Sequence, residues 1–215
     1  MSNVPMLKLH TVAGSPNGRK VEAVIAHLGL KVEILRHDFG DLASPAFKAI
    51  NPNGMVPVLA VEGYRLTESN AIMQYLAEMA GDERLYPRDA RGRAEVARWQ
   101  AWELVHFNRA FGALAFEIVA KPLLKLGPAD PVAVAEAQVG LARFAPVLEA
   151  HMKDRSFLLG DNLTIADYSV ATFESYRTIT PFDWSPFPAV NAYLDRVHAT
   201  EVWRRVSAKP EPVAV

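Results

Sequence analysis

The stretch NPNGMVPVLAVEGYRL, residues 51–66, predicts a turn, a short strand, a tight turn and a second strand. Asn, Pro and Gly crowd the first turn, and VPVLAV at 56–61 is the nearly continuous apolar run of a buried strand. Pro57 has no N–H to donate to a neighbouring strand, so we expect it at a strand start or a sheet edge. The turn at 62–64 then joins 56–61 to an antiparallel strand at 64–66.

The flanking residues extend this hairpin to a βαβαββα order over about 80 residues. Segments 6–12 and 31–36 alternate apolar and polar side chains, as half-buried strands do. Between them, apolar residues at helical spacing lead to Gly29, which suits a helix C-terminal cap. Ser44 and Pro45 suit the start of a short helix, and 68–79 carries another helical apolar stripe.

The chain changes character after the polar stretch 81–90. Beyond it we find no strand pattern; the segments with helical periodicity are 91–120, 131–153 and 165–179, with shorter helices over 188–205. Thr164 and Asp167 have the spacing of a capping box at a helix start. The prediction is an α+β protein with two domains, an α/β domain at 1–82 and an all-helical domain at 91–215.

Composition narrows the classes of function. The 215 residues are 50% hydrophobic and 22% charged, with a formal net charge of −1 and no cysteine. The charge balance argues against a nucleic-acid partner, and the absence of a long apolar run argues against a membrane protein. Lacking a basic segment followed by an apolar one, the N-terminus predicts a cytoplasmic location. Any thiol chemistry must use a thiol supplied by a ligand.

Four stretches, in this order and at these spacings, resemble the soluble glutathione S-transferases: SPNGRKV at 15–21, NPNGMVPVL at 51–59, LTESNAI at 66–72 and LTIADYSV at 163–170. The resemblance covers essentially the whole chain. It implies a thioredoxin-like domain followed by a helical bundle, glutathione as co-substrate with no separate cofactor, and a homodimer. The SPNG stretch resembles the bacterial and fungal group that carries Ser/Thr-Pro-Asn.

The resemblance also implies how glutathione is held. The Val56–Pro57 peptide bond is expected to be cis, with the Val56 backbone pairing with the cysteinyl residue like an added strand. Ser69 and the helix start behind it would hold the γ-glutamyl carboxylate, with Glu68 near the same group. Taken without the resemblance, Ser69 is equally an N-cap and Glu68 a first-turn acid.

Thiol activation falls to Ser15 and Asn17 in this interpretation. A thiolate is the nucleophile, and hydrogen-bond donors at a helix start lower a thiol's pKa. Either residue can be the main donor. The sequence SPNG at 15–18 is also typical of an ordinary turn followed by a helix cap.

The glycyl end of glutathione and the second substrate are less defined. Met55 stands where many members carry Lys or Gln, so Asn53 or Lys48 is expected to hold the glycyl carboxylate. Phe107 and Phe111 are expected to line a pocket for the electrophile. Gln100 and Glu103 are expected on a solvated face; the alternative is that, in a dimer, the pair reaches the γ-glutamyl ammonium bound by the other subunit.

Metal binding is not expected, because His10 and His37 lack partners at metal-ligand spacing. The predicted function is conjugation of glutathione to small hydrophobic electrophiles. The alternatives are glutathione-dependent disulfide or peroxide reduction, and a non-catalytic binding module of the same fold.

Overall fold

The computed structural model describes residues 6–207, which divide into two compact units. The first unit contains the chain up to Glu83 and also α10 (Glu201–Ser207); the second is Arg84–Thr200. The structure thus groups α10 with the first unit, whereas the ranges expected from sequence assign it to the helical part. Those ranges, 1–82 and 91–215, stay a prediction for the domain limits.

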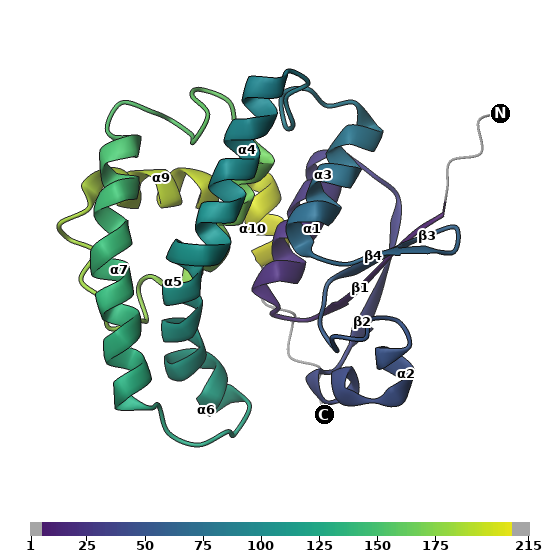
Figure 1. Cartoon of the computed structure of the whole chain (residues 1–215), viewed down its shortest axis with the longest axis horizontal. Helices are drawn as coiled ribbons and strands as arrows, with labels where there is room; N and C mark the ends of the chain where they lie inside the picture. The colour runs from purple at the N-terminus through teal and green to yellow at the C-terminus, as the bar shows by residue number, and fades with distance from the viewer. Residues whose placement is uncertain (1–5, 208–215) are drawn as a thin grey trace. The chain divides into compact units, whose positions relative to one another are not determined.

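The first unit has the predicted βαβαββα order (Figure 1). Its elements are β1 (Leu7–Val12), α1 (Pro16–His27), β2 (Val32–His37), a 3₁₀ helix η1 (Phe39–Ala43), α2 (Pro45–Lys48), β3 (Val58–Val61), β4 (Tyr64–Leu66) and α3 (Ser69–Ala80). The sheet order is β2-β1-β3-β4, with β2 parallel to β1 and the other pairs antiparallel. Only η1 was not predicted. It begins at a capping box formed by Asp38 and Asp41.

The strand alternation of β1 separates the two faces of the sheet. Leu9 and Thr11 are fully buried on one face, where a Cβ at Gly18 of α1 would collide with the Thr11 hydroxyl. The opposite face carries His10 and faces α2 (Pro45–Lys48), whose Phe47 meets the ring of His37 from β2. Helices therefore cover both faces of this sheet.

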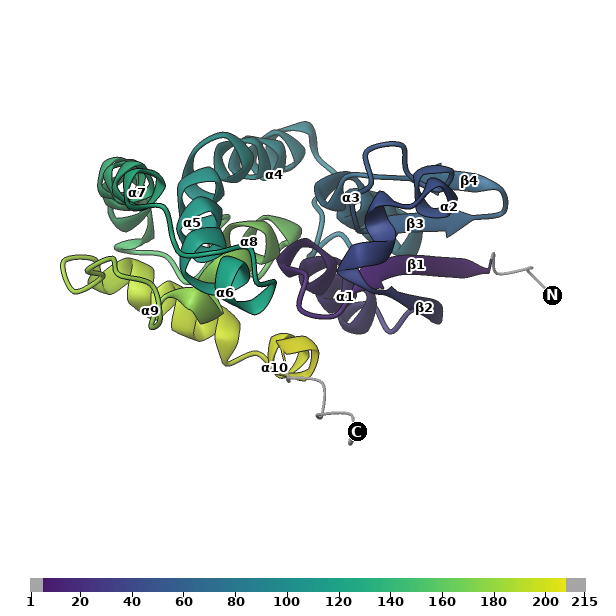
Figure 2. The same ribbon diagram turned by 90° about the horizontal axis from the view of Figure 1, so that it is seen from below.

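Helix α10 returns to the first unit and packs on α1 (Figures 1 and 2). Trp203 is fully buried, and the Arg19 guanidinium lies 4.7 Å from the centre of its ring. Arg19 Nη1 also donates to Ser207 Oγ at 3.3 Å. The first turn of α1 is thus held by residues that lie more than 180 positions later in the chain.

The second unit is helical, as predicted. One long helical run consists of α4 (Ala90–Trp102), α5 (Asn108–Ala115) and α6 (Lys121–Leu123), joined by the π-helical segments η2 (Glu103–Phe107) and η3 (Phe116–Ala120). It is followed by α7 (Pro131–Met152), α8 (Ile165–Val170), the 3₁₀ helix η4 (Ala171–Tyr176) and α9 (Pro188–His198). The two π segments were not predicted.

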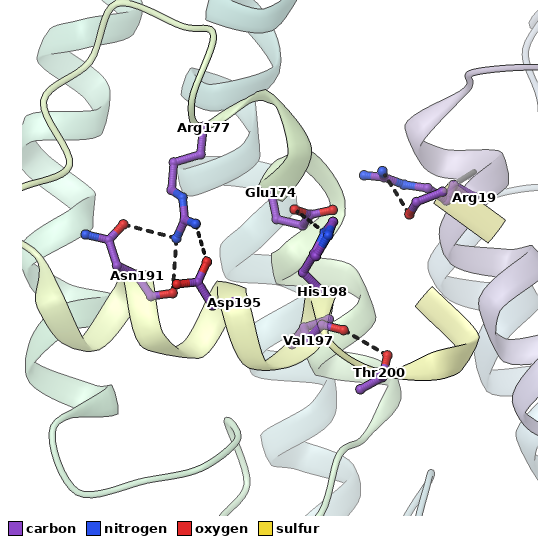
Figure 3. Close-up of polar contacts among 9 residues, drawn as sticks. Arg19, Glu174, Arg177, Asn191, Asp195, Val197, His198 and Thr200 are labelled. Carbon is purple, nitrogen blue, oxygen red and sulfur yellow. Dashed lines mark hydrogen bonds and ion pairs between the residues drawn. The ribbon is translucent and has the colours of Figure 1, made fainter. Parts of the chain in front are cut away.

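Polar contacts fix α8, η4 and α9 to one another. The capping box of Thr164 and Asp167 is present at the start of α8, and Asp167 also accepts the Leu158 N–H at 2.8 Å. Arg177, which follows η4, hydrogen-bonds the Asn191 carbonyl at 3.0 Å and pairs with Asp195 (Figure 3). Over the described residues 6–207, no helix combines the length and apolarity needed to cross a bilayer.

Candidate functional site

The chain before β3 is held in shape by a side chain that the sequence analysis overlooked. Asn51 is 3% exposed; its Nδ2 donates to the Met55 carbonyl at 2.7 Å and its Oδ1 accepts the Asn53 N–H at 3.1 Å. The loop then turns at Gly54, which has a φ of 62° and lies against the Leu42 carbonyl. Asn51 therefore bridges the turn that delivers Val56.

Val56 precedes strand β3 and is joined to it through Pro57. The Val56–Pro57 bond is cis, which confirms that prediction. Within the described part of the chain, neither the N–H nor the C=O of Val56 makes a hydrogen bond. An extended peptide can pair with such groups by adding a strand.

The start of α3 has an unusual backbone. Glu68 occupies the N-cap position with φ 65° and ψ 109°, a conformation that side chains seldom adopt, and its exposed carboxylate makes no capping bond. Sparsely populated backbone conformations of this kind concentrate at binding sites. Ser69 follows and is nearly buried. The start of α3 therefore has no side-chain cap from Glu68, and the N–H groups of a helix start can bind an anion.

The start of α1 meets the start of α3. Ser15 is 7% exposed and caps α1, its Oγ accepting the Gly18 N–H at 3.1 Å. Asn17 is exposed, and its Oδ1 accepts the Ser69 hydroxyl at 3.4 Å. Two helix N-termini, two hydroxyls and one carboxamide are therefore gathered within the first unit. Helix starts and such donors stabilise anions.

Thr11 lies beneath this cluster and was not foreseen from the sequence. Its Oγ1 is buried and has no hydrogen-bond partner among the described residues. Because a Cβ at position 18 would collide with this hydroxyl, the glycine of the PNG sequence permits the close approach of α1 to β1.

The residues expected near a glycyl carboxylate lie in the same loop region. Met55 and Asn53 are exposed. Lys48, at the end of α2, is exposed, and its Cε would lie 3.9 Å from a Cβ at Gly54. The structure thus places one cation beside the turn that precedes Val56.

Phe107 and Phe111 are buried within the second unit, and their place in an electrophile pocket stays a prediction. They are 0% and 1% exposed, and both rings pack on Trp184, at 6.2 and 5.2 Å. Aromatic side chains at helical spacing are most often core residues, and this pair belongs to that majority.

Gln100 and Glu103 are buried as well, contrary to the expectation of a solvated face. Gln100 Nε2 donates to Ser169 Oγ at 3.2 Å, and Asn108 Nδ2 donates to Glu103 Oε2 at 2.8 Å. This polar group joins the long helical run to α8. Residues 6–207 contain no cluster of three or more His, Cys, Asp or Glu side chains suited to a metal ion.

Comparison with known proteins decides the family. The profile of the glutathione S-transferase N-terminal domain matches residues 5–78, and that of the C-terminal domain matches residues 131–196. The chain belongs to the glutathione S-transferase family.

Individual members of the family match over nearly their whole length. Glutathione S-transferase 3 of Zea mays is 32% identical over 208 residues, covering 95% of this chain and 90% of the relative. A glutathione S-transferase of Hyoscyamus muticus is 32% identical over 205 residues, covering 93% and 96%.

A solved structure of the family was determined with glutathione bound. It is the theta class glutathione S-transferase of Xanthomonas axonopodis pv. citri, 26% identical with a TM-score of 0.84, covering 96% of this chain and 99% of that one. The present chain has the fold of this family, a thioredoxin-like four-stranded domain followed by a helical domain, which confirms the predicted fold class.

Proposed function

We propose that this family member transfers the thiol of glutathione to small hydrophobic electrophiles, with the site built at the starts of α1 and α3 and at Val56. The observation that carries the proposal is the contact between Asn17 Oδ1 and Ser69 Oγ at 3.4 Å. It joins a helix start suited to a thiolate to a helix start suited to a carboxylate, and Val56 of the same unit has an unpaired backbone to which a peptide can add as a strand.

Glutathione is held along its peptide backbone in this proposal. Val56 pairs with the cysteinyl residue, since its N–H and C=O make no other hydrogen bond within residues 6–207. The start of α3 at Ser69 receives the γ-glutamyl carboxylate, and the exposed Glu68 faces the ammonium of the same residue. Pro57 directly precedes the buried strand β3, and Asn53 or Lys48 contacts the glycyl carboxylate.

Asn17 and Ser15 stabilise the thiolate. The hydrogen bond from Ser69 engages the Asn17 carbonyl oxygen, which leaves the Asn17 NH₂ as a donor. Ser15 Oγ accepts the Gly18 N–H and keeps its own O–H proton for a ligand. This orientation of Asn17 supports placing the chain in the Ser/Thr-Pro-Asn group, in which the amide takes or shares the role of thiol donor.

Binding and turnover test the proposal together. Calorimetric titration with glutathione is expected to show one site per chain, and chlorodinitrobenzene is expected to be conjugated by the parent protein. Loss of both on replacing Ser69 and Glu68 by Ala would support the assigned site. Binding without conjugation, but with turnover of an organic disulfide, would favour the reductase alternative. No glutathione binding would contradict the proposal and favour a non-catalytic module.

A homodimer completes the proposed organisation, since two-fold assemblies are the commonest oligomers. The edge strand β4 exposes Tyr64, and the outer side of α3 exposes Met79, so apolar surface is present on the first unit. Light scattering is expected to give twice the chain mass of 23.7 kDa. A single species of chain mass at micromolar concentration would contradict it.

A further inference from the structure

Two histidines contact each other on the α2 face of the sheet, and the proposed chemistry uses neither. His10 Nδ1 lies 2.9 Å from His37 Nε2, and the two rings are stacked with centroids 5.2 Å apart. At this distance one nitrogen donates a hydrogen bond and the other accepts it. Both side chains are half-buried, so solvent protons can reach them.

His10 adjoins the strand that presents Val56. It pairs across the sheet with Val58, the first residue of β3 and the second residue after Val56. Paired residues on antiparallel strands point to the same face, so the His10 ring lies beside the start of β3. A displacement of this ring acts on β3 two residues from the proposed glutathione contact.

His37 adjoins the loop that leads to the same strand. Its ring meets the edge of Phe47, with centroids 5.0 Å apart, and Phe47 is buried. The Phe47 carbonyl accepts the Asn51 N–H at 2.9 Å, and Asn51 in turn holds the Met55 carbonyl. The pair therefore contacts both chain segments that flank Val56.

Protonation changes the hydrogen bond between the rings. With one added proton, an imidazolium donates to a neutral imidazole and the contact survives. With two, an N–H faces an N–H between like charges, and the bond is lost. The two-proton state therefore drives the rings apart.

The surroundings of His10 oppose its protonation. Burial lowers the pKa of His10, and the positive charges of His37, Arg65 and Lys8 lower it further. Glu33 acts in the opposite sense, although its carboxylate is paired with Lys8 at 2.9 Å.

The elements on the α2 side carry charges of both signs. Asp41 of η1 accepts the Asp38 N–H at 3.2 Å, and Lys48 ends α2. Because the pKa of His10 is lowered on folding, the unfolded chain binds protons more readily than the folded unit. Acidification through the histidine range therefore lowers the stability of the folded unit.

We propose that His10 and His37 are a positioning pair for the glutathione-binding strand, and that glutathione affinity falls when both rings are protonated. The proposal rests on the proposed function only for the identity of the ligand. Neither histidine contacts glutathione; both act through Val58, Phe47 and Asn51.

The test is the dissociation constant of S-methylglutathione at about pH 7 and about pH 5, a range that spans histidine titration. The methyl group removes the thiol from the titration, and the peptide's carboxylates ionise below this range. For the parent, we expect the constant to rise at least about threefold on acidification. For His37→Gln and His10→Asn, which cannot carry two charges at the pair, we expect it to change less than about half as much.

His27→Asn is the matched control, since His27 is an exposed histidine of the same unit and should keep the parent profile. Each variant is compared with itself at the two pH values, so a general loss of affinity does not imitate the effect. A parent constant that is the same at both pH values, or a His37→Gln profile equal to the parent's, would overturn the proposal.

A second readout separates this proposal from the proposed function. If the parent binds no S-methylglutathione at neutral pH, the proposed function is wrong. The histidine pair then still predicts that acidification lowers the thermal midpoint of the parent more than that of His37→Gln. Equal midpoint changes in the two proteins would overturn the positioning pair independently of any ligand.

Discussion

At the scale of single residues, the site depends on side chains that hold other groups in place. The Asn17 side chain accepts a hydrogen bond from the Ser69 hydroxyl, and Ser15 caps the helix on which Asn17 lies. Asn51 holds the loop before β3 in place by donating a hydrogen bond to the Met55 carbonyl. These contacts are short-range in space, yet the first joins residues 52 positions apart.

Replacing the proposed thiol donors should raise the pKa of bound glutathione. Loss of one donor of this type costs on the order of 10²–10³ in rate at most, and we expect less because the start of α1 remains. Asn17→Ala should reduce turnover at least as much as Ser15→Ala, with smaller effects on glutathione affinity. The ultraviolet absorbance of the bound thiolate against pH measures the shift. If both single variants and the double variant show the thiolate titration and the turnover rate of the parent, neither residue activates the thiol. The motif would then serve only as a turn and a helix cap.

Asn51→Ala should weaken both folding and glutathione binding. The substitution leaves the Met55 carbonyl and the Asn53 N–H without their buried partner, at a cost of about 1–3 kcal/mol. Urea unfolding and calorimetric titration measure the two effects. For stability, Asn53→Ala is the matched control, because its side chain is exposed and only its backbone makes the loop contact. Equal stability of the two variants would contradict the bridging role of Asn51.

At the scale of elements, helix starts are specified locally and then used by distant parts of the chain. Thr164 and Asp167 form the predicted capping box of α8, but Asp167 also accepts the Leu158 N–H and lies fully buried. This capping box is therefore part of the core of the second unit. Burial raises the pKa of Asp167 to about 6.

The stability of the second unit should respond to pH through this carboxyl group. The folded protein keeps a proton on Asp167 that the unfolded chain releases near pH 3.8, so the free energy of unfolding falls as pH rises from about 4 to about 6. The change amounts to about 3 kcal/mol at 1.4 kcal/mol per pKa unit. Urea unfolding across this range, compared with Asp167→Asn, isolates the contribution. An identical pH slope in both proteins would contradict it.

At the scale of the whole molecule, the first unit is built from both ends of the described chain. Helix α10 follows the second unit in sequence and packs on α1 (Figure 2). Its Trp203 is buried, with the Arg19 guanidinium over the ring. The start of α1, which carries Ser15 and Asn17, is therefore supported by a helix that lies outside residues 1–82.

Trp203→Ala should destabilise the first unit by about 3–5 kcal/mol, the usual cost of removing a buried aromatic side chain. We expect lower glutathione affinity as well, because α1 loses the ring beneath Arg19. Hydrogen exchange of α1 amides and calorimetric titration measure the two effects. Arg205→Ala, on the exposed side of α10, should leave both unchanged. Parent-like α1 protection in Trp203→Ala would show that α10 does not support the site.

The sequence by itself determined the order of elements and most of the proposed glutathione contacts. Strand alternation, Gly29, Ser44 with Pro45, and the Thr164 capping box all act over a few neighbouring residues, so their patterns can be recognised in a linear chain. The motif resemblance added Val56, Ser69, Ser15 and Asn17, all four of which the structure places in the first unit.

Tertiary structure alone decided which polar and aromatic groups are buried and which helix supports which. Gln100, Glu103, Phe107 and Phe111 occupy the interior of the second unit, although their spacing on a helix equally suits a surface. The His10–His37 contact, the Asn17–Ser69 bond and the packing of Trp203 join residues 27, 52 and more than 180 positions apart. Such contacts depend on packing between elements, and helical or strand periodicity specifies only which face of an element is apolar, not which side chain it will meet.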